Sequence, residues 1–218
     1  MIQIDDAGSG SLVGGTCIGA MRKETGEYYY DIIPIELYQP KNFEKKIYLE
    51  SVVSIAQSLF KKLDINKTEK IEVCRGYMFD RLRPWLRENQ YDFMNTSIGE
   101  PLQTVVERTF SQYVIQLGLP PSYIHYTKYP FHFHRLLRWV YADYDNRKIL
   151  CKRGWRSWEK YGALKVEKKA GSLNHSRYNC LRCGEPIMGN SPVEILKYIS
   201  NKPNTIYLHC NCKDRLKK

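Results

Sequence analysis

The chain has 218 residues, of which 34 are lysine or arginine and 23 are aspartate or glutamate, so its net charge is +11 at pH 7. Its length and its 43% content of hydrophobic residues exclude a fully disordered chain and a small protein held together by disulfides. No apolar run approaches the ~18 residues that a membrane span needs, so we expect no membrane partner.

The first part of the chain has the pattern of an antiparallel β-meander followed by a helix. Apolar and β-branched segments predict strands over residues 2–5, 16–21 and 28–35. A glycine-rich stretch separates the first two strands. Residues 44–63 carry apolar side chains at helical spacing, which predicts a long amphipathic helix.

Strands and helices then alternate as far as residue 144. The predicted strands are 70–74 and 91–96. The predicted helices are 77–88, 101–117 and 129–144. An antiparallel start followed by alternating helices and strands indicates an α/β domain with a mixed sheet and flanking helices.

The last third of the chain has a different composition. Residues 146–175 are basic and lack a clear period, which favours a loop-rich arm or linker. Residues 191–194 (Ser-Pro-Val-Glu) have the pattern of a capping box with proline at the first helical position, which predicts a short helix to about Ile199. A strand is expected at 205–209. We therefore divide the chain into an α/β domain (1–145), an arm (146–175) and a small C-terminal module (176–218).

Two carboxylates close the first predicted strand. Asp5 and Asp6 stand directly before the glycines. Adjacent carboxylates repel each other, and a divalent cation with oxygen ligands is the simplest counter-ion. The alternative is local, because one aspartate can accept hydrogen bonds from the backbone of the following turn while the other is solvated.

The residues around this pair carry a family resemblance. Residues 4–20 run I-D-D-A-G-S-G-S-L-V-G-G-T-C-I-G-A, which resembles the first motif of type II ribonucleases H, roughly (I)-D-E-A-G-R-G-P-L-(A/V)-G-P. The resemblance assigns Asp5 to the first metal-binding aspartate, Asp6 to its acidic neighbour, and Ser9 and Gly10 to the loop that contacts the substrate. Ser9 replaces the family's substrate-contacting arginine and Ser11 its proline. The element order is also similar to the ribonuclease H-like fold, which the resemblance implies for the first domain.

The resemblance implies further acidic residues. In the family the fourth strand ends in a catalytic aspartate, but the strand near Cys74 has none, and Glu72 is the candidate one step back. The family's last acid precedes a helix, where Glu100 matches best and Glu107 is the substitute. Such carboxylates would hold two Mg²⁺ or Mn²⁺ ions for phosphodiester hydrolysis. The ordinary interpretation is that Glu72 is a strand charge and that Glu100 is favoured by the helix dipole.

Four of the seven cysteines are spaced like metal ligands. They are Cys180, Cys183, Cys210 and Cys212. The first pair is a C-x-x-C-G knuckle, and 26 residues separate it from the C-x-C pair. Four thiolates satisfy a tetrahedral Zn²⁺ and leave no open position, which indicates a structural site. His209 or His175 could replace one thiolate.

The remaining cysteines, Cys17, Cys74 and Cys151, have the pattern of small core residues. The N-terminus lacks the basic and then apolar plan of a signal peptide, so we expect a cytoplasmic protein with reduced thiols.

The positive charge is concentrated in the second half. Residues 1–120 hold 14 basic and 16 acidic side chains, whereas residues 121–218 hold 20 and 7. In residues 128–169 basic side chains alternate with aromatic ones, and the strongest candidates for nucleic-acid contact are Arg153, Trp155, Arg156 and Trp158. Basic groups neutralise phosphates, and rings stack on bases. Trp139 lies in an apolar run and is expected in the core, and for His132 and His134 we favour a hydrogen-bonded structural role.

Three functions are open from the sequence. The first is a metal-dependent nuclease acting on RNA, DNA, a hybrid or a branched substrate, as a homodimer if it cuts junctions. The second is a nucleic-acid-binding protein of the same fold with an incomplete site, since the strand-end aspartate is absent. The third is an actin-like phosphate-binding kinase or ATPase, which the short chain and basic tail fit poorly.

Overall fold

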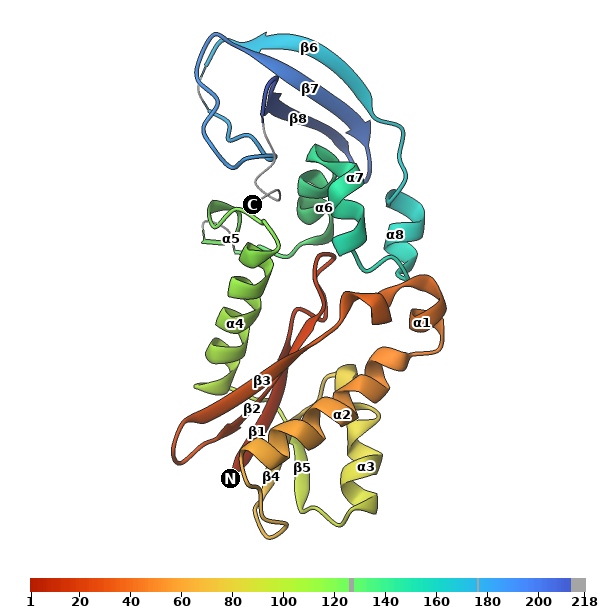
Figure 1. Cartoon of the computed structure of the whole chain (residues 1–218), viewed down its shortest axis with the longest axis vertical. Helices are drawn as coiled ribbons and strands as arrows, with labels where there is room; N and C mark the ends of the chain where they lie inside the picture. The colour runs from red at the N-terminus through yellow and green to blue at the C-terminus, as the bar shows by residue number, and fades with distance from the viewer. Residues whose placement is uncertain (126–127, 176, 213–218) are drawn as a thin grey trace. The chain divides into compact units, whose positions relative to one another are not determined.

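The computed structural model describes residues 1–125, 128–175 and 177–212 (Figure 1). The chain forms two compact units. Unit 1 comprises Met1–Gly10 and Gly14–Tyr113, and unit 2 comprises Ser11–Val13 and Val114–Lys218. Each unit has a sheet and helices of its own.

A mixed five-stranded sheet forms the centre of unit 1. Its strand order is β3-β2-β1-β4-β5. The strands are β1 (Ile2–Ala7), β2 (Thr16–Arg22), β3 (Glu27–Ile33), β4 (Ile71–Cys74) and β5 (Phe93–Thr96). β2 pairs antiparallel with both β1 and β3, whereas β4 pairs parallel with both β1 and β5. The predicted mixed α/β architecture and all five predicted strands are therefore confirmed.

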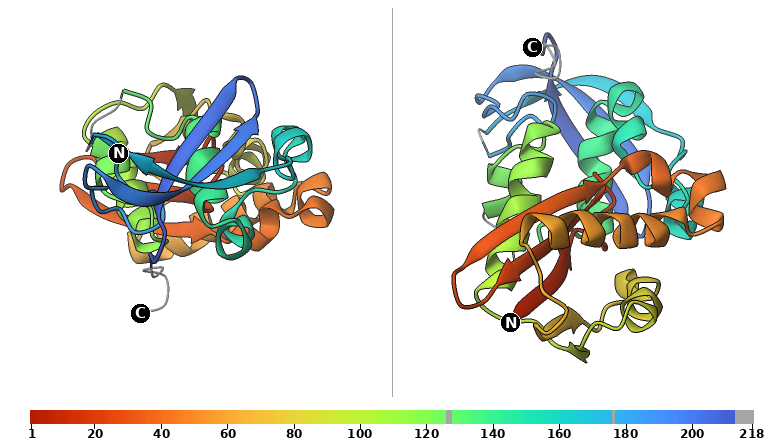
Figure 2. Two further views of the ribbon diagram at one scale, coloured as in Figure 1. Left: turned by 90° about the horizontal axis from the view of Figure 1, so that it is seen from above. Right: turned by 60° about the horizontal axis from the view of Figure 1, so that its bottom comes forward.

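Two long helices pack on opposite faces of this sheet (Figure 2). The helices of unit 1 are η1 (Ile35–Tyr38), α1 (Pro40–Glu44), α2 (Ile47–Lys62), η2 (Tyr77–Phe79), α3 (Leu82–Glu88) and α4 (Leu102–Gln116). The apolar stripe of α2 packs with Ile4 and Ile18 in the main core. On the other face α4 approaches closely, because a Cβ on Gly19 would lie 3.3 Å from the Val106 side chain.

Two predicted helices have other bounds in the structure. The predicted helix 44–63 is confirmed as α2, which begins at Ile47 after Lys46 in the left-handed conformation (φ 55°), so that only Glu44 of the predicted range falls in α1. The predicted helix 77–88 becomes η2 and α3, with Pro84 in the first turn of α3, where its missing N–H costs no helical hydrogen bond.

Unit 2 combines short helices with a three-stranded sheet. Its helices are α5 (Ser122–His125), α6 (Phe133–Ala142), α7 (Tyr144–Arg147), η3 (Lys148–Leu150) and α8 (Arg156–Tyr161). β6 (Glu167–Leu173), β7 (Ser191–Ile199) and β8 (Pro203–His209) form an antiparallel sheet in sequence order. The prediction of a helix over 191–199 was wrong. β7 pairs along its length with both neighbours, and this pairing overrides the local capping signal.

Residues 146–175 are not a loop-rich arm. They contain η3, α8 and β6, and their connections are held by hydrogen bonds. The Tyr141 hydroxyl donates to the carbonyl of Tyr161, and the Tyr144 hydroxyl donates to that of Gly162. The structure therefore joins this segment to the C-terminal region in one unit, and its boundary near residue 113 differs from the predicted one at 145. Among the helices in the described ranges, none has the length and apolar character to cross a membrane.

Candidate metal centres

The first centre lies beside the end of β4, in the last half of β1. The two strands run parallel, with Ile4 opposite Val73, so the next residues along are Asp5 and Cys74. Ligand atoms of Asp5, Asp6 and Cys74 all lie within 4.8 Å of one another. Because parallel neighbouring strands end at the same edge of a sheet, residues about 70 positions apart meet here. The structure thus brings together the predicted aspartate pair and a cysteine that we had expected to be an ordinary core residue.

The electrostatics of this centre favour a cation. Burial raises the pKa of the Asp5 carboxyl above its usual value; hydrogen bonds from the Cys74 thiol and the Asp6 N–H lower it, and the charge of Glu107 raises it. Burial also raises the pKa of the Cys74 thiol to about 11, and the two aspartates add to this effect. Burial therefore disfavours the charged form of Asp5 in particular, and a bound cation would stabilise that charge.

The other predicted acids lie outside this cluster. Glu72 is one step back on β4, where its carboxylate accepts a hydrogen bond from Gln3 (2.8 Å). Glu100 is exposed at the start of α4 and accepts a hydrogen bond from the Thr104 hydroxyl. Glu107, the predicted substitute, is the α4 residue whose charge acts on Asp5. Of the two predicted acids near the start of α4, Glu107 and not Glu100 is thus the one whose charge affects Asp5.

The glycine-rich loop follows the aspartates directly. Gly8 has φ 85°, and a Cβ there would lie 2.1 Å from the Phe110 ring of α4, so only glycine fits this close approach. Ser9 is half-buried and Gly10 is exposed, with open space where a Cβ would stand. The two predicted contact residues are therefore held beside the carboxylates by a tightly packed turn.

The second centre is a cluster of three cysteines and a histidine in unit 2. Its members are Cys180, Cys183, His209 and Cys212. The sulfurs of Cys180 and Cys212 are 3.8 Å apart, and the Cys183 sulfur lies 3.4 Å from Nδ1 of His209. Tetrahedral zinc with bonds of about 2.3 Å to sulfur and about 2.0 Å to nitrogen requires edges of about 3.8 Å and about 3.5 Å. The four ligand atoms therefore suit an ion such as zinc.

The predicted ligand Cys210 lies outside this cluster. It is exposed, and His209, the alternative named from the sequence, takes its place. The reason is spacing, since His209 and Cys212 repeat the three-residue separation of Cys180 and Cys183, which lets both members of a pair point inward across a turn. The H-x-x-C pattern was visible in the sequence and could have identified the histidine.

Backbone N–H groups support the cluster electrostatically. Burial alone would raise the pKa of the Cys180 thiol. Hydrogen bonds to its sulfur, among them those from the backbone N–H groups of His209, Cys183 and Arg182, outweigh burial and hold that pKa below its usual value. The N–H of His209 lies 3.5 Å from the sulfur. Such donors stabilise a thiolate, the form that binds metal.

A buried arginine joins the Cys180–Cys183 knuckle to helix α6 through hydrogen bonds. Arg147 is only 1% exposed, and its guanidinium lies 4.1 Å from the centre of the Trp139 ring. It donates hydrogen bonds of 2.7–2.9 Å to the carbonyls of Trp139, Leu181 and Arg182. Leu181 and Arg182 are the two residues between the knuckle cysteines. Arg147 is therefore a structural residue, although it lies in the basic segment 128–169 in which nucleic-acid contacts were predicted.

The predicted nucleic-acid contacts lie around α8. Arg153 and Arg156 are exposed, whereas Trp155 and Trp158 are half-buried. The ring of Trp158 packs on Gly162, where a Cβ would lie 2.4 Å from it. The two arginines are thus accessible to a polyanion, while Trp158 contributes largely to packing.

The histidine pair packs against aromatic rings. The His134 ring lies edge-on to Tyr161 with centroids 4.8 Å apart, and 5.9 Å from His132. Within the described residues, Nδ1 of His134 is buried without a hydrogen-bond partner. Ring packing is therefore the structural role that the contacts of His134 support, and hydrogen bonding of the pair stays a prediction.

Comparison with known proteins adds no family to this description. The sequence matches no protein-family model, and the search of curated proteins finds no significant relative. The function must therefore be argued from the two centres and the charge of unit 2.

Proposed function

We propose that this chain is a divalent-metal-dependent nuclease with a ribonuclease H-like unit 1 and a zinc-stabilised, basic unit 2. The observation that carries the proposal is the convergence of Asp5 and Asp6 with the end of β4. Convergent carboxylates at strand ends are the arrangement that two-metal hydrolysis of phosphodiesters uses.

The strand arrangement supports the fold assignment. Three antiparallel strands followed by two parallel ones, in the order β3-β2-β1-β4-β5, agree with the ribonuclease H-like topology that the first motif implied. In this fold the first and fourth strands supply acids at adjacent ends, which is where Asp5 and Cys74 stand.

The donor set fits one class of ion at this centre. Carboxylate oxygens suit Mg²⁺ and Mn²⁺, and Asp5 and Asp6 would hold the ion. The Cys74 sulfur suits Mn²⁺ better than Mg²⁺, since thiolates favour softer ions. A metal here would activate water and stabilise the leaving oxygen during hydrolysis.

The chain's own residues would prepare the substrate. Asp5 is buried beside the Gly8 turn, which keeps the half-buried Ser9 and the exposed Gly10 close to the carboxylates. Unit 2 carries 20 basic and 7 acidic residues, enough to attract a nucleic acid. The exposed Arg153 and Arg156 would contact phosphates.

Cys74 also favours a second function. With a cysteine where the family has an aspartate, the first centre has fewer carboxylates than a two-metal site uses. A chain with such a site could bind nucleic acid without cutting it. This alternative shares the fold and the basic unit and differs only in catalysis.

A substrate panel separates the two functions. The purified chain is incubated with Mg²⁺ or Mn²⁺ and labelled single-stranded RNA, RNA–DNA hybrid, duplex DNA and a four-way junction. A nuclease cleaves at least one substrate, more efficiently with Mn²⁺, and Asp6→Asn reduces the cleavage. Salt-sensitive binding to these substrates with no cleavage under either metal would support the binding protein instead.

A further inference from the structure

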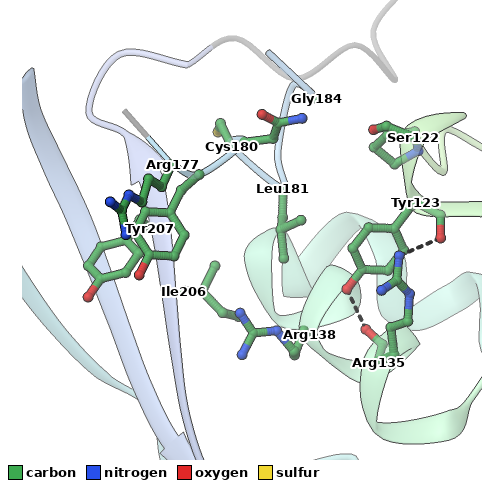
Figure 3. Close-up of a pocket in the computed structure, with 13 residues that line it drawn as sticks. Ser122, Tyr123, Arg135, Arg138, Arg177, Cys180, Leu181, Gly184, Ile206 and Tyr207 are labelled. Atoms are coloured by element: carbon green, nitrogen blue, oxygen red, sulfur yellow. Dashed lines mark hydrogen bonds between the residues drawn. The ribbon is translucent and has the colours of Figure 1, made fainter. Parts of the chain in front are cut away.

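Unit 2 contains a cavity of about 580 Å³ beside the zinc knuckle (Figure 3). One wall comes from α5 and α6, another from the knuckle at Cys180, Leu181 and Gly184, and a third from β8. Its volume falls within the range of small-molecule sites, about 300–1,000 Å³. Neither metal centre accounts for this cavity.

The cavity is strongly basic. Arg135, Arg138 and Arg177 line it, and no carboxylate is found among the described lining residues. Two of the arginines are fixed in place, since Arg135 donates to the carbonyl of Tyr123 (2.6 Å) and Arg138 to that of Thr205 (2.9 Å). The guanidinium of Arg177 makes no hydrogen bond or ion pair with any described residue. Prearranged cations without counter-charges indicate an anionic ligand.

The cavity is also aromatic. The rings of Tyr178 and Tyr207 lie 4.7 Å apart at an angle of 48°, and Tyr178 is 48% exposed. In the view of Figure 3, Arg177 and Tyr207 lie to the left, Tyr123 and Arg135 to the right, and Arg138 between them. A ring with an open face next to a guanidinium offers a planar ligand a stacking surface and its phosphate a partner.

We propose that this cavity binds a nucleoside monophosphate unit, with its base against Tyr178 and Tyr207 and its phosphate on Arg138 and Arg177. A phosphate alone would leave the tyrosines unused, and an uncharged ring would leave three arginines uncompensated. The unit could be free or part of a single strand. The preference for a single-stranded nucleic acid over a free nucleotide rests on the proposed nuclease function. The nucleotide site itself does not depend on that function.

The knuckle links this site to the second metal centre. Cys180 is both a cluster member and a lining residue, and Leu181 next to it is held by Arg147. Loss of the metal would release one wall of the cavity. Nucleotide affinity should therefore depend on zinc, although the metal itself does not contact the ligand.

Binding is tested on the full chain by fluorescence anisotropy with a labelled ten-residue oligothymidylate. No Mg²⁺ or Mn²⁺ is added, so that cleavage is suppressed, and no chelator is used, so that zinc is retained. Thymidine 5′-monophosphate, thymidine and inorganic phosphate compete. We expect the monophosphate to compete at least about tenfold better than thymidine or phosphate, since stacking on one base contributes about 1–3 kcal/mol. Equal competition by phosphate would overturn the nucleotide assignment.

Variants locate the site. Arg177→Gln and Tyr178→Ala should each weaken binding about tenfold. The controls are Lys202→Gln, which removes one exposed charge from the same unit, and Tyr129→Ala, which removes a ring that is 66% exposed outside the cavity. Both controls should bind like the wild type, and equal losses in controls and cavity variants would show diffuse attraction instead of a site. Zinc content and circular dichroism confirm that each variant is folded.

The source of the ligand follows from the same titrations. Tenfold tighter binding of the oligonucleotide than of the monophosphate supports a strand, and equal affinities support a free nucleotide at the same site. Cleavage with Mn²⁺ is measured separately. Cleavage without cavity-dependent binding would overturn the nucleotide site and support the proposed nuclease function. Cavity-dependent binding without cleavage would support the nucleotide site and overturn the nuclease function.

Discussion

The sulfur of Cys74 and a carboxylate oxygen of Asp5 lie within 4.8 Å of each other across two adjacent parallel strands. The pair stands at the end of β4, where the resembling family has a catalytic aspartate. Asp5 and Asp6 therefore have a neutral neighbour at ordinary pH, because the pKa of Cys74 is raised to about 11 by burial and by the aspartates. As a candidate metal centre, the first centre would hold hard cations less strongly than a centre of three carboxylates.

Cys74→Asp should strengthen the first centre. The substitution supplies the missing oxygen ligand, so Mg²⁺-dependent cleavage should rise at least about tenfold, the scale on which single groups around a metal alter affinity or activity. The measurement is the initial rate of cleavage as Mg²⁺ is titrated. Cys74→Ser is the control, since it removes the sulfur without adding a charge, and a rise in both variants would contradict the interpretation.

The proposed zinc ligands can be distinguished by measuring the metal content of single variants. Cys183→Ser and His209→Ala should both lose the bound ion, since each removes one of four ligands. Cys210→Ser should retain one zinc per chain, because Cys210 is exposed and outside the cluster. Metal content of the purified variants is measured by mass spectrometry. Zinc lost from Cys210→Ser and kept in His209→Ala would restore the four-cysteine set.

Arg147→Lys should destabilise unit 2 although it conserves charge. A single ammonium cannot reach the three carbonyls that the guanidinium serves, and buried carbonyls left without donors would cost about 3 kcal/mol in the free energy of unfolding. Urea unfolding followed by tryptophan fluorescence measures this loss. The exposed Arg156→Lys provides the comparison and should change stability by less than about 0.5 kcal/mol. Similar urea midpoints of unfolding for both variants would show that the hydrogen bonds of Arg147 do not stabilise unit 2.

Stability should decrease in mild acid because of His134. Burial, and then the charges of His132, Lys160 and Lys202, lower the pKa of His134 from its usual 6.5. The unfolded chain thus binds this proton at a higher pH than the folded one. The neutral His134 therefore contributes fully to stability above pH 6.5. This contribution is lost as the pH falls from 6.5 through the lower pKa of the folded state, and stability does not change further on its account below that pKa.

The control for this pH dependence is His134→Phe, which keeps an aromatic ring beside Tyr161 and removes the titration. Melting temperatures between pH 5 and pH 8 should fall less steeply towards acid in this variant than in the wild type. Identical slopes would assign the acid sensitivity to other groups.

Local patterns predicted most of unit 1. In α2, in α4 and in the short β-branched strands, the spacing of apolar residues follows which side chains face the core. These helices and strands could therefore be predicted from nearby residues alone. β7 was mispredicted because its partners, β6 and β8, override a capping signal that is purely local. The role of Cys74 was hidden for a similar reason, since it depends on the register of β4 against β1.

The ligand set of the second centre shows the same limit. The knuckle at Cys180 and Cys183 was evident from its spacing, but the choice between His209 and Cys210 depends on which side chain the turn after β8 directs inward. The basic residues of unit 2 could be counted but not sorted, because burial alone distinguishes Arg147 from the exposed Arg153.

The most direct test of the proposed function is the Mn²⁺-dependent cleavage rate of Asp5→Asn against wild type, on whichever nucleic acid the substrate panel identifies. The variant keeps the shape of the buried side chain and removes a carboxylate ligand. Cleavage should fall at least about a hundredfold, the scale of losing a group that stabilises charge in the transition state, while binding is retained. Asp92→Asn, an exposed aspartate of the same unit, should cleave normally. Full activity in Asp5→Asn would contradict the proposed catalytic centre.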